Sequence, residues 1–267
     1  MRLLPLLCCL LALAWLRPAA AQGEAGAVEV DLELVLAVDV SRSMSPHELE
    51  IQRRGYAEAL MSEEVIQAIA GGAYGQVALT YVEWAGWQSQ RVVVPWTLVR
   101  DRADAEAFAR RLTLDFSEAL RRTSISGLID FAAAGFEGNG FAGFRRVIDI
   151  SGDGPNNDGR PVTAARDAAL ARGLVINGLP LMTREGLGAQ WHLDDLDLYY
   201  RDCVIGGPLA FVIPVRDWAD FPRAVRSKLV MELVGRPPTA SPLRRPAQGY
   251  DCLIGEKIWR DMMGDWY

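Results

Sequence analysis

A repeated order of short apolar runs, polar loops and amphipathic helical segments is the sequence feature that most constrains this fold. The run from Leu32 to Val38 lacks alternation and indicates a mostly buried strand. Further strands are expected at residues 76–84, 91–98, 146–151, 174–181 and 209–214. Helices are expected at residues 45–61, 103–111, 127–136, 161–172 and 217–234. Strands that alternate with helices predict a doubly wound, mostly parallel α/β sheet of Rossmann-like type.

The third expected strand departs from the parallel pattern. A turn near Gly86 joins it to the second strand, and Pro95 lies inside it. Because proline has no N–H to donate to a neighbouring strand, a strand that contains it belongs at the edge of a sheet. We therefore predict one antiparallel edge strand in an otherwise parallel sheet.

The first expected helix has a well-defined start. Ser45 can cap it, Pro46 suits its first turn, and Glu48 completes a capping box. We therefore assign the Ser45 hydroxyl to the helix cap and not to a ligand site.

The first 21 residues have the pattern of a secretory signal peptide. Arg2 precedes the apolar run Leu3–Leu16, and residues 19–21 are the small alanines of a cleavage site before Gln22. The run is shorter than the roughly 20 apolar residues that span a bilayer. We expect a periplasmic or secreted chain with no stable membrane insertion after cleavage; an N-terminal membrane anchor is the alternative.

The charge of the chain argues against one class of partner. The formal net charge is −6, and loss of Arg2 and Arg17 with the signal peptide would make it −8. Sequence-independent nucleic-acid binding depends on neutralisation of phosphates by Lys and Arg. We therefore expect no nucleic-acid partner.

Two cysteines would remain after cleavage, since Cys8 and Cys9 lie in the signal peptide. In an oxidising compartment, Cys203 and Cys252 are expected to form one disulfide, with two free buried thiols as the alternative. Beyond Gly235 the composition shifts to Pro, Arg and Gly. We therefore divide the mature chain into one domain, residues 22–235, and a C-terminal arm, residues 236–267, which the disulfide would tie back onto the domain.

Three short polar loops contain the candidate functional residues. The first, Asp39-Val40-Ser41-Arg42-Ser43, follows the first strand, and the second, residues 123–127, precedes a helix. The third, residues 151–157, begins at the end of the fourth strand and contains Asp153-Gly154. Ligands of open α/β sheets bind beyond the carboxyl ends of the strands. We therefore expect the three loops to meet at that edge.

This arrangement resembles the metal-ion-dependent adhesion site of von Willebrand factor type A domains. The resemblance covers roughly residues 29–235, and the phrase Ser-Gly-Asp-Gly-Pro-Asn-Asn is also similar to one in an uncharacterised group of exported bacterial proteins with this domain. It implies that Ser41, Ser43 and Thr123 coordinate a metal ion through their hydroxyls. Asp39 and Asp153 would lie nearby and act partly through water. One departure is Gly152, which stands between Ser151 and Asp153.

The ligand types also indicate a cation without reference to the family. Hydroxyl and carboxylate oxygens suit a hard cation such as Mg²⁺, Mn²⁺ or Ca²⁺, and not zinc or copper. Few carboxylates among the direct ligands would leave the ion able to accept a carboxylate from a partner. Taken singly, Asp39 and Thr123 have simpler interpretations as helix caps and Asp153 as a turn residue.

These residues support three functional hypotheses. The first is an exported, divalent-cation-dependent binding domain that recognises an acidic group on a partner; the second is a metal-dependent hydrolase; the third is a structural domain with a vestigial site. A hydrolase would need a general base near a metal-bound water. Asp39, Asp153 and His47 are the candidates for that base, and the chain has no Gly-x-Ser-x-Gly nucleophile motif.

Overall fold

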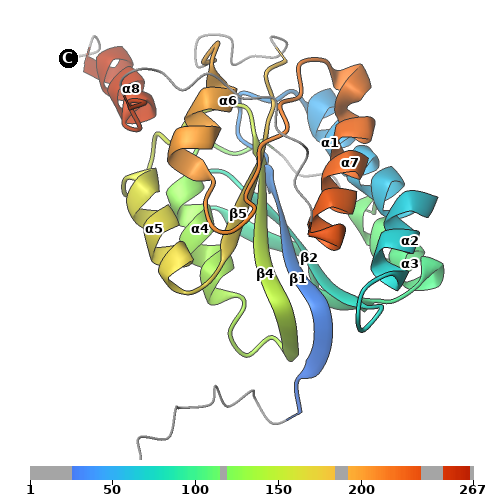
Figure 1. Ribbon diagram of the computed structural model, residues 1–267. Coiled ribbons are helices and arrows are strands. Elements are labelled where there is room, and N and C mark those ends of the chain that lie inside the picture. Colours follow the sequence, from blue (N-terminus) through green and yellow to red (C-terminus); the bar gives the residue numbers. More distant parts are fainter. Residues whose placement is uncertain (1–25, 115–118, 184–191, 236–248, 265–267) are drawn as a thin grey trace, which may run out of the picture.

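A five-stranded sheet forms the centre of the protein in the computed structural model, which describes residues 26–114, 119–183, 192–235 and 249–264 (Figure 1). The expected signal peptide therefore lies outside the described residues. The strands are β1 (Val28–Asp39), β2 (Val77–Trp84), β3 (Gln90–Val99), β4 (Phe141–Gly152) and β5 (Val175–Pro180). Their order across the sheet is β3-β2-β1-β4-β5. The predicted α/β class is confirmed.

Four of the strands run parallel, with β1 at the centre. It pairs with β2 on one side and with β4 on the other, and β5 continues the parallel arrangement beyond β4. Only β3 runs antiparallel, and it lies at the edge beside β2. Pro95 lies within this strand. The predicted antiparallel edge strand is therefore confirmed, because a proline is tolerated where one side of a strand has no partner.

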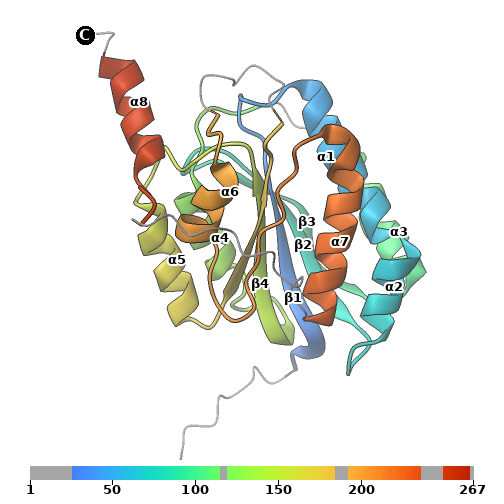
Figure 2. The same cartoon turned by 45° about the horizontal axis from the view of Figure 1, so that its top comes forward.

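Helices cover both faces of the sheet. They are α1 (Pro46–Leu60), α2 (Glu63–Ala70), α3 (Arg102–Leu112), α4 (Ile125–Ala134), α5 (Val162–Ala171), α6 (Leu196–Tyr199), α7 (Phe221–Val234) and α8 (Ile254–Gly264). One face carries α1, α2, α3 and α7, and the other carries α4, α5 and α6 (Figures 1 and 2). Each face has its own buried apolar cluster. None of the helices in the described part of the chain could cross a membrane.

The start of α1 follows the predicted capping box. The Ser45 hydroxyl accepts a hydrogen bond from the Glu48 amide (3.3 Å), and the Glu48 carboxylate accepts one from the Ser45 amide (2.6 Å). The second Glu48 oxygen accepts a hydrogen bond from the Trp218 indole (3.0 Å), just before α7. The cap therefore also ties α1 to the segment that leads into α7.

The predicted last strand is wrong as a regular element. Residues 209–214 form only isolated bridges, between Val212 and Gly178 and, just beyond, between Val215 and Leu181. Leu209 has a positive φ of 63°, and Pro214 cannot donate a hydrogen bond. The segment therefore lies along β5 and forms hydrogen bonds with it only at intervals, so it does not make a continuous strand.

The C-terminal arm contains a helix that composition did not predict. Helix α8 follows the disulfide between Cys203 and Cys252, whose predicted pairing is confirmed. The disulfide closes a loop of 49 residues, for which chain entropy gives a stabilisation of about 4 kcal/mol. Figures 1 and 2 both place α8 at the upper end of the molecule, towards which β1 runs.

A buried ionic cluster joins α7 to the sheet. The Lys228 ammonium forms ion pairs with Asp149 of β4 and with Glu232 one turn further along α7 (2.5 Å to Glu232), and all three side chains are buried. Asn177 of β5 donates a further hydrogen bond to Glu232 (2.9 Å). Burial and the Glu232 charge raise the pKa of Asp149 to about 7, although Lys228 lowers it. One lysine therefore serves two buried carboxyl groups.

We predict that Lys228→Met destabilises the protein by about 3–5 kcal/mol, because it leaves buried acids without their cation. Loss of Lys228 should raise the Asp149 pKa further above about 7. When a carboxyl group has a higher pKa in the folded than in the unfolded protein, the free energy of unfolding falls as the pH rises from the unfolded pKa to the folded pKa. The variant should therefore lose more stability than the parent between about pH 6 and about pH 9. Urea unfolding at both pH values measures this.

Lys257→Met is the matched control, because Lys257 forms an exposed ion pair with Asp251 (2.6 Å). It should cost less than about 1 kcal/mol, and its cost should not grow with pH. Equal losses for the two variants would contradict the assigned role of Lys228.

Candidate cation site

The carboxyl ends of β1 and β4 bring two of the predicted loops together. The parallel register pairs Val38 with Ser151, so that Asp39 and Asp153 both follow at the same edge of the sheet. The Leu120 amide donates to the Val40 carbonyl (2.8 Å), which places the segment before Thr123 against the first loop. The loops therefore meet where the sequence analysis expects them.

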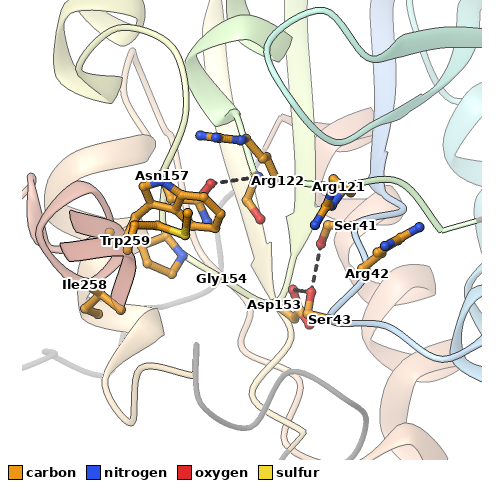
Figure 3. Close-up of a pocket in the computed structure, with 14 residues that line it drawn as sticks. Ser41, Arg42, Ser43, Arg121, Arg122, Asp153, Gly154, Asn157, Ile258 and Trp259 are labelled. Atoms are coloured by element: carbon orange, nitrogen blue, oxygen red, sulfur yellow. Dashed lines mark hydrogen bonds between the residues drawn. The ribbon is translucent and has the colours of Figure 1, made fainter. Parts of the chain in front are cut away.

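Direct hydrogen bonds connect the first loop to Asp153. The Ser41 and Ser43 hydroxyls lie 2.8 Å apart, and the Ser43 hydroxyl donates to the Asp153 carboxylate (2.8 Å; Figure 3). The Asp39 carboxylate accepts a hydrogen bond from the Ser41 amide (2.7 Å). The structure thus joins Asp39, Ser41, Ser43 and Asp153 in one continuous chain of polar contacts.

Thr123 reaches the same site through a different loop. Its amide donates to the Asn157 side chain (3.0 Å), and its carbonyl accepts from the Asn157 amide (2.9 Å). Thr123 lines one pocket of about 510 Å³ together with Ser41, Ser43 and Asp153. Asp39 does not line that pocket, and it is fully buried.

The two carboxyl groups lie in an environment that disfavours their charges. Burial raises the pKa of Asp39 well above its ordinary range, and the nearby Asp153 carboxylate raises it further, against the Ser41 hydrogen bonds. Burial also raises the pKa of Asp153, while the Ser43 hydrogen bond and the His192 charge lower it. Among the described residues, the second Asp39 oxygen is buried and has no hydrogen-bond partner. An added cation would stabilise both charges and supply the missing contact.

The neutral hydroxyls distinguish this site from a cluster of charged ligands. No group of three or more His, Cys, Asp or Glu side chains that could hold a metal occurs in the described ranges. The candidate site instead combines two carboxyl groups with the hydroxyls of Ser41, Ser43 and Thr123. Such a set of oxygen ligands fits a hard cation.

Gly152, the departure from the family pattern, lies at a crowded position. A Cβ atom there would be 2.9 Å from the Tyr200 hydroxyl and 3.0 Å from the unpartnered Asp39 oxygen. Burial and the Asp39 charge raise the pKa of Tyr200 well above its ordinary range. A glycine is therefore required for the end of β4 to pass close to Asp39, and Tyr200 is a neighbour of the site that the sequence did not indicate.

Other pocket residues also escaped prediction. Arg42, Pro155 and Asn157 lie within the first and third predicted loops but were not singled out; outside those loops are Arg121, Arg122, Gly255, Ile258, Trp259 and Met263. No local pattern distinguishes them, because α8 and the loop before α4 approach the site only in the folded chain. Trp84 is buried. Trp87 is exposed but does not line this pocket, and neither does His47.

Comparisons with known proteins identify the family. A family model matches residues 29–237, which is more than half of the chain. The chain belongs to the family described as Protein of unknown function (DUF1194). A search of curated proteins finds no match.

Solved structures with a similar fold identify the fold of this chain. Proximal thread matrix protein 1 from the mussel byssus, "with zinc occupied MIDAS motif", is 16% identical with a TM-score of 0.52, covering 78% of this chain and 48% of its own. A von Willebrand factor type A protein from Catenulispora acidiphila is 15% identical with a TM-score of 0.50, covering 77% and 43%. The pilus adhesin SpaC from Lactobacillus rhamnosus GG is 11% identical with a TM-score of 0.56, covering 76% and 31%.

The DUF1194 chain therefore has a von Willebrand factor type A fold, as the resemblance implied. It matches less than half the length of each of these three proteins. At these identities the likeness concerns the fold alone.

We predict that Gly152→Ala lowers the free energy of unfolding by about 1–3 kcal/mol, because the added methyl group would crowd Asp39 and Tyr200. Gly154→Ala, two residues away, is the control, since a Cβ there meets no atom within 4 Å. Its stability should stay within about 1 kcal/mol of the parent. Urea unfolding measures the free energy of unfolding of both variants. Equal losses of stability would contradict the assigned packing around Gly152.

Proposed function

We propose that this protein is an exported binding protein that uses a divalent cation to recognise an acidic group on a partner. Residues 22–235 form its von Willebrand A-like domain and residues 236–267 its C-terminal arm. The observation that carries the proposal is the contact chain Ser41–Ser43–Asp153 beside a buried Asp39, one oxygen of which has no hydrogen-bond partner within the described ranges. Two confined carboxyl groups with neutral hydroxyls beside an open pocket favour a cation over an empty site.

The proposed ion is Mg²⁺, with Mn²⁺ or Ca²⁺ as the other candidates. The Ser41, Ser43 and Thr123 hydroxyls would coordinate it directly, and Asp39 and Asp153 would act partly through water. Mg²⁺ prefers octahedral coordination by oxygen and commonly retains some exchangeable ligands. A carboxylate on the partner can take such a position, which gives the ion a role in recognition.

The charge of the chain makes this attraction local. An acidic protein repels an acidic partner at long range, but exposed charges are screened beyond about 8–10 Å at physiological salt. Contact between the partner's carboxylate and the ion then decides binding.

Export to the periplasm or the cell exterior is part of the proposal. The Cys203–Cys252 disulfide supports it, because disulfides persist in oxidising compartments and are rare in the cytosol. The signal-peptide pattern of residues 1–21 supports it as well.

We predict that Asp39→Ala, or Ser41→Ala combined with Ser43→Ala, abolishes divalent-cation binding while the fold is retained. The reason is that each change removes oxygens from the proposed ligand set. Isothermal calorimetry with Mg²⁺, Mn²⁺ and Ca²⁺ measures binding, and circular dichroism checks the fold.

Ser45→Ala is the matched control for these serine variants. Its hydroxyl caps α1 and does not line the pocket, so the variant should lose about 1 kcal/mol of stability and bind the cation like the parent. If the double serine variant also binds like the parent, the ion does not bind here.

We further predict that partner binding requires both the ion and the Thr123 hydroxyl. The immobilised mature protein should retain a partner from periplasmic extract with Mg²⁺ but not with EDTA. Thr123→Ala should lose that partner, whereas Thr123→Ser, which keeps a hydroxyl, should retain it.

Three outcomes would reject the binding proposal. Partners that remain bound in EDTA, or no partner in either condition, would support a structural domain with a vestigial site. Turnover of a phosphate or acyl ester that depends on the metal and on Asp153 would support the metal-dependent hydrolase.

A further inference from the structure

Helix α8 forms one wall of the pocket that contains the candidate cation site. Ile258, Trp259 and Met263 of this helix line the pocket opposite the loop of Ser41 and Ser43. Figure 3 shows Ile258 and Trp259 across the pocket from Ser41 and Ser43, with Asp153 between them in this view. The arm therefore contributes an apolar surface to a site whose base is polar.

Several contacts fix α8 in this position. The Asn156 side chain donates to Glu256 (2.8 Å), and a side chain at position 255 would collide with the Asn156 carbonyl. The Arg122 guanidinium lies over the Trp259 ring at 4.3 Å. Together with the disulfide at Cys252, these contacts hold the helix directly against the loop that follows β4.

The opposite side of the pocket carries positive charge. Arg42 and Arg121 line it, and both are exposed. In the described part of the chain, neither guanidinium has an ion-pair or hydrogen-bond partner, whereas Arg122 has Asp158 (3.5 Å). In a chain with net charge −6, two unpaired arginines beside a cation site form a local region that attracts anions.

We infer that the partner presents an acidic peptide segment with two neighbouring carboxylates and an adjoining apolar side chain. This inference rests on the proposed function, because the first carboxylate binds the cation. The second carboxylate pairs with Arg42 and Arg121, whose planar guanidinium groups suit carboxylates. The apolar side chain packs on Ile258, Trp259 and Met263.

The chemistry of the walls selects this ligand over simpler anions. A single carboxylate would satisfy the ion but leave both arginines and the apolar wall unused. A phosphate or another small anion would use the charges without contacting α8. A peptide segment provides two separate anions and an apolar group that can share one pocket of about 510 Å³.

Capped synthetic peptides and the full mature protein test the inference by fluorescence polarisation in Mg²⁺. The reference peptide is Gly-Leu-Asp-Asp-Leu-Gly. In two further peptides one or the other aspartate is replaced by asparagine, and in a fourth both leucines are replaced by glycine. The reference should bind about tenfold more tightly than each of the others.

Variants of the protein assign these differences to the two walls. Arg42→Gln combined with Arg121→Gln should weaken the reference peptide about tenfold and reduce the salt dependence of its binding, but should leave the single-aspartate peptides nearly unchanged. Trp259→Ala and the milder Met263→Ala should reduce the advantage of leucine over glycine. Arg260→Gln and Leu253→Ala are the matched controls, because neither residue lines the pocket.

The outcomes separate this inference from the proposed function. If Mg²⁺ binds and a single-aspartate peptide binds as tightly as the reference, or no peptide binds, the inferred ligand is wrong while the cation site stands. If the arginine and α8 variants bind all peptides like the parent, the inferred ligand is also wrong. If calorimetry detects no Mg²⁺ binding, the proposed function fails and this inference fails with it.

Discussion

The parallel pairing of β1 with both β2 and β4 is the constraint on which the rest of the structure depends. It places β1 at the centre of the sheet, and the strand buries its apolar side chains from Val30 to Val38 on both faces. It also ends β1 and β4 at one edge, where Asp39 and Asp153 follow in adjacent loops. A shift of one residue in the pairing of β1 with β4 would turn buried side chains to the other face and separate these carboxyl groups.

Buried carboxyl groups occur in two settings on this frame. Asp149 and Glu232 share Lys228, which supplies one positive charge to the two carboxyl groups from within the chain. Asp39 and Asp153 are also buried, but hydroxyls and an amide are what contacts them, and the pKa of each is raised. Both pairs therefore require a nearby positive charge to stabilise buried carboxylates. Lys228 meets this requirement only in the first pair. The proposed cation would meet it in the second.

Much of the fold could be predicted because it depends on local sequence. Continuous apolar runs, the capping box at Ser45 and the proline in β3 each act within a few residues. Residues 209–214 were different: their composition suits a strand, but Leu209 adopts a positive φ and Pro214 lacks an N–H, so the ladder is interrupted. Helix α8 follows a Pro- and Arg-rich stretch whose composition predicted only a tail.

The residues of the candidate site also fall into those that the sequence could predict and those that it could not. Asp39, Ser41 and Ser43 form a compact motif after a strand, and Asp153 follows another strand, so their meeting could be expected from topology alone. Arg121, Trp259 and Tyr200 come from distant segments, and only tertiary packing brings them near the motif. The reason for Gly152 likewise became visible only with Tyr200 and Asp39 in place.

The interrupted segment along β5 has a consequence for self-association. An exposed sheet edge is a template onto which another chain can add a strand. Here residues 206–215 already take hydrogen bonds along β5, and Pro208 and Pro214 offer no donors to a further strand. At the opposite edge, β3 contains Pro95, which has no N–H to donate. Both edges of the sheet thus resist growth into intermolecular β-structure, and pairing through either edge strand is disfavoured.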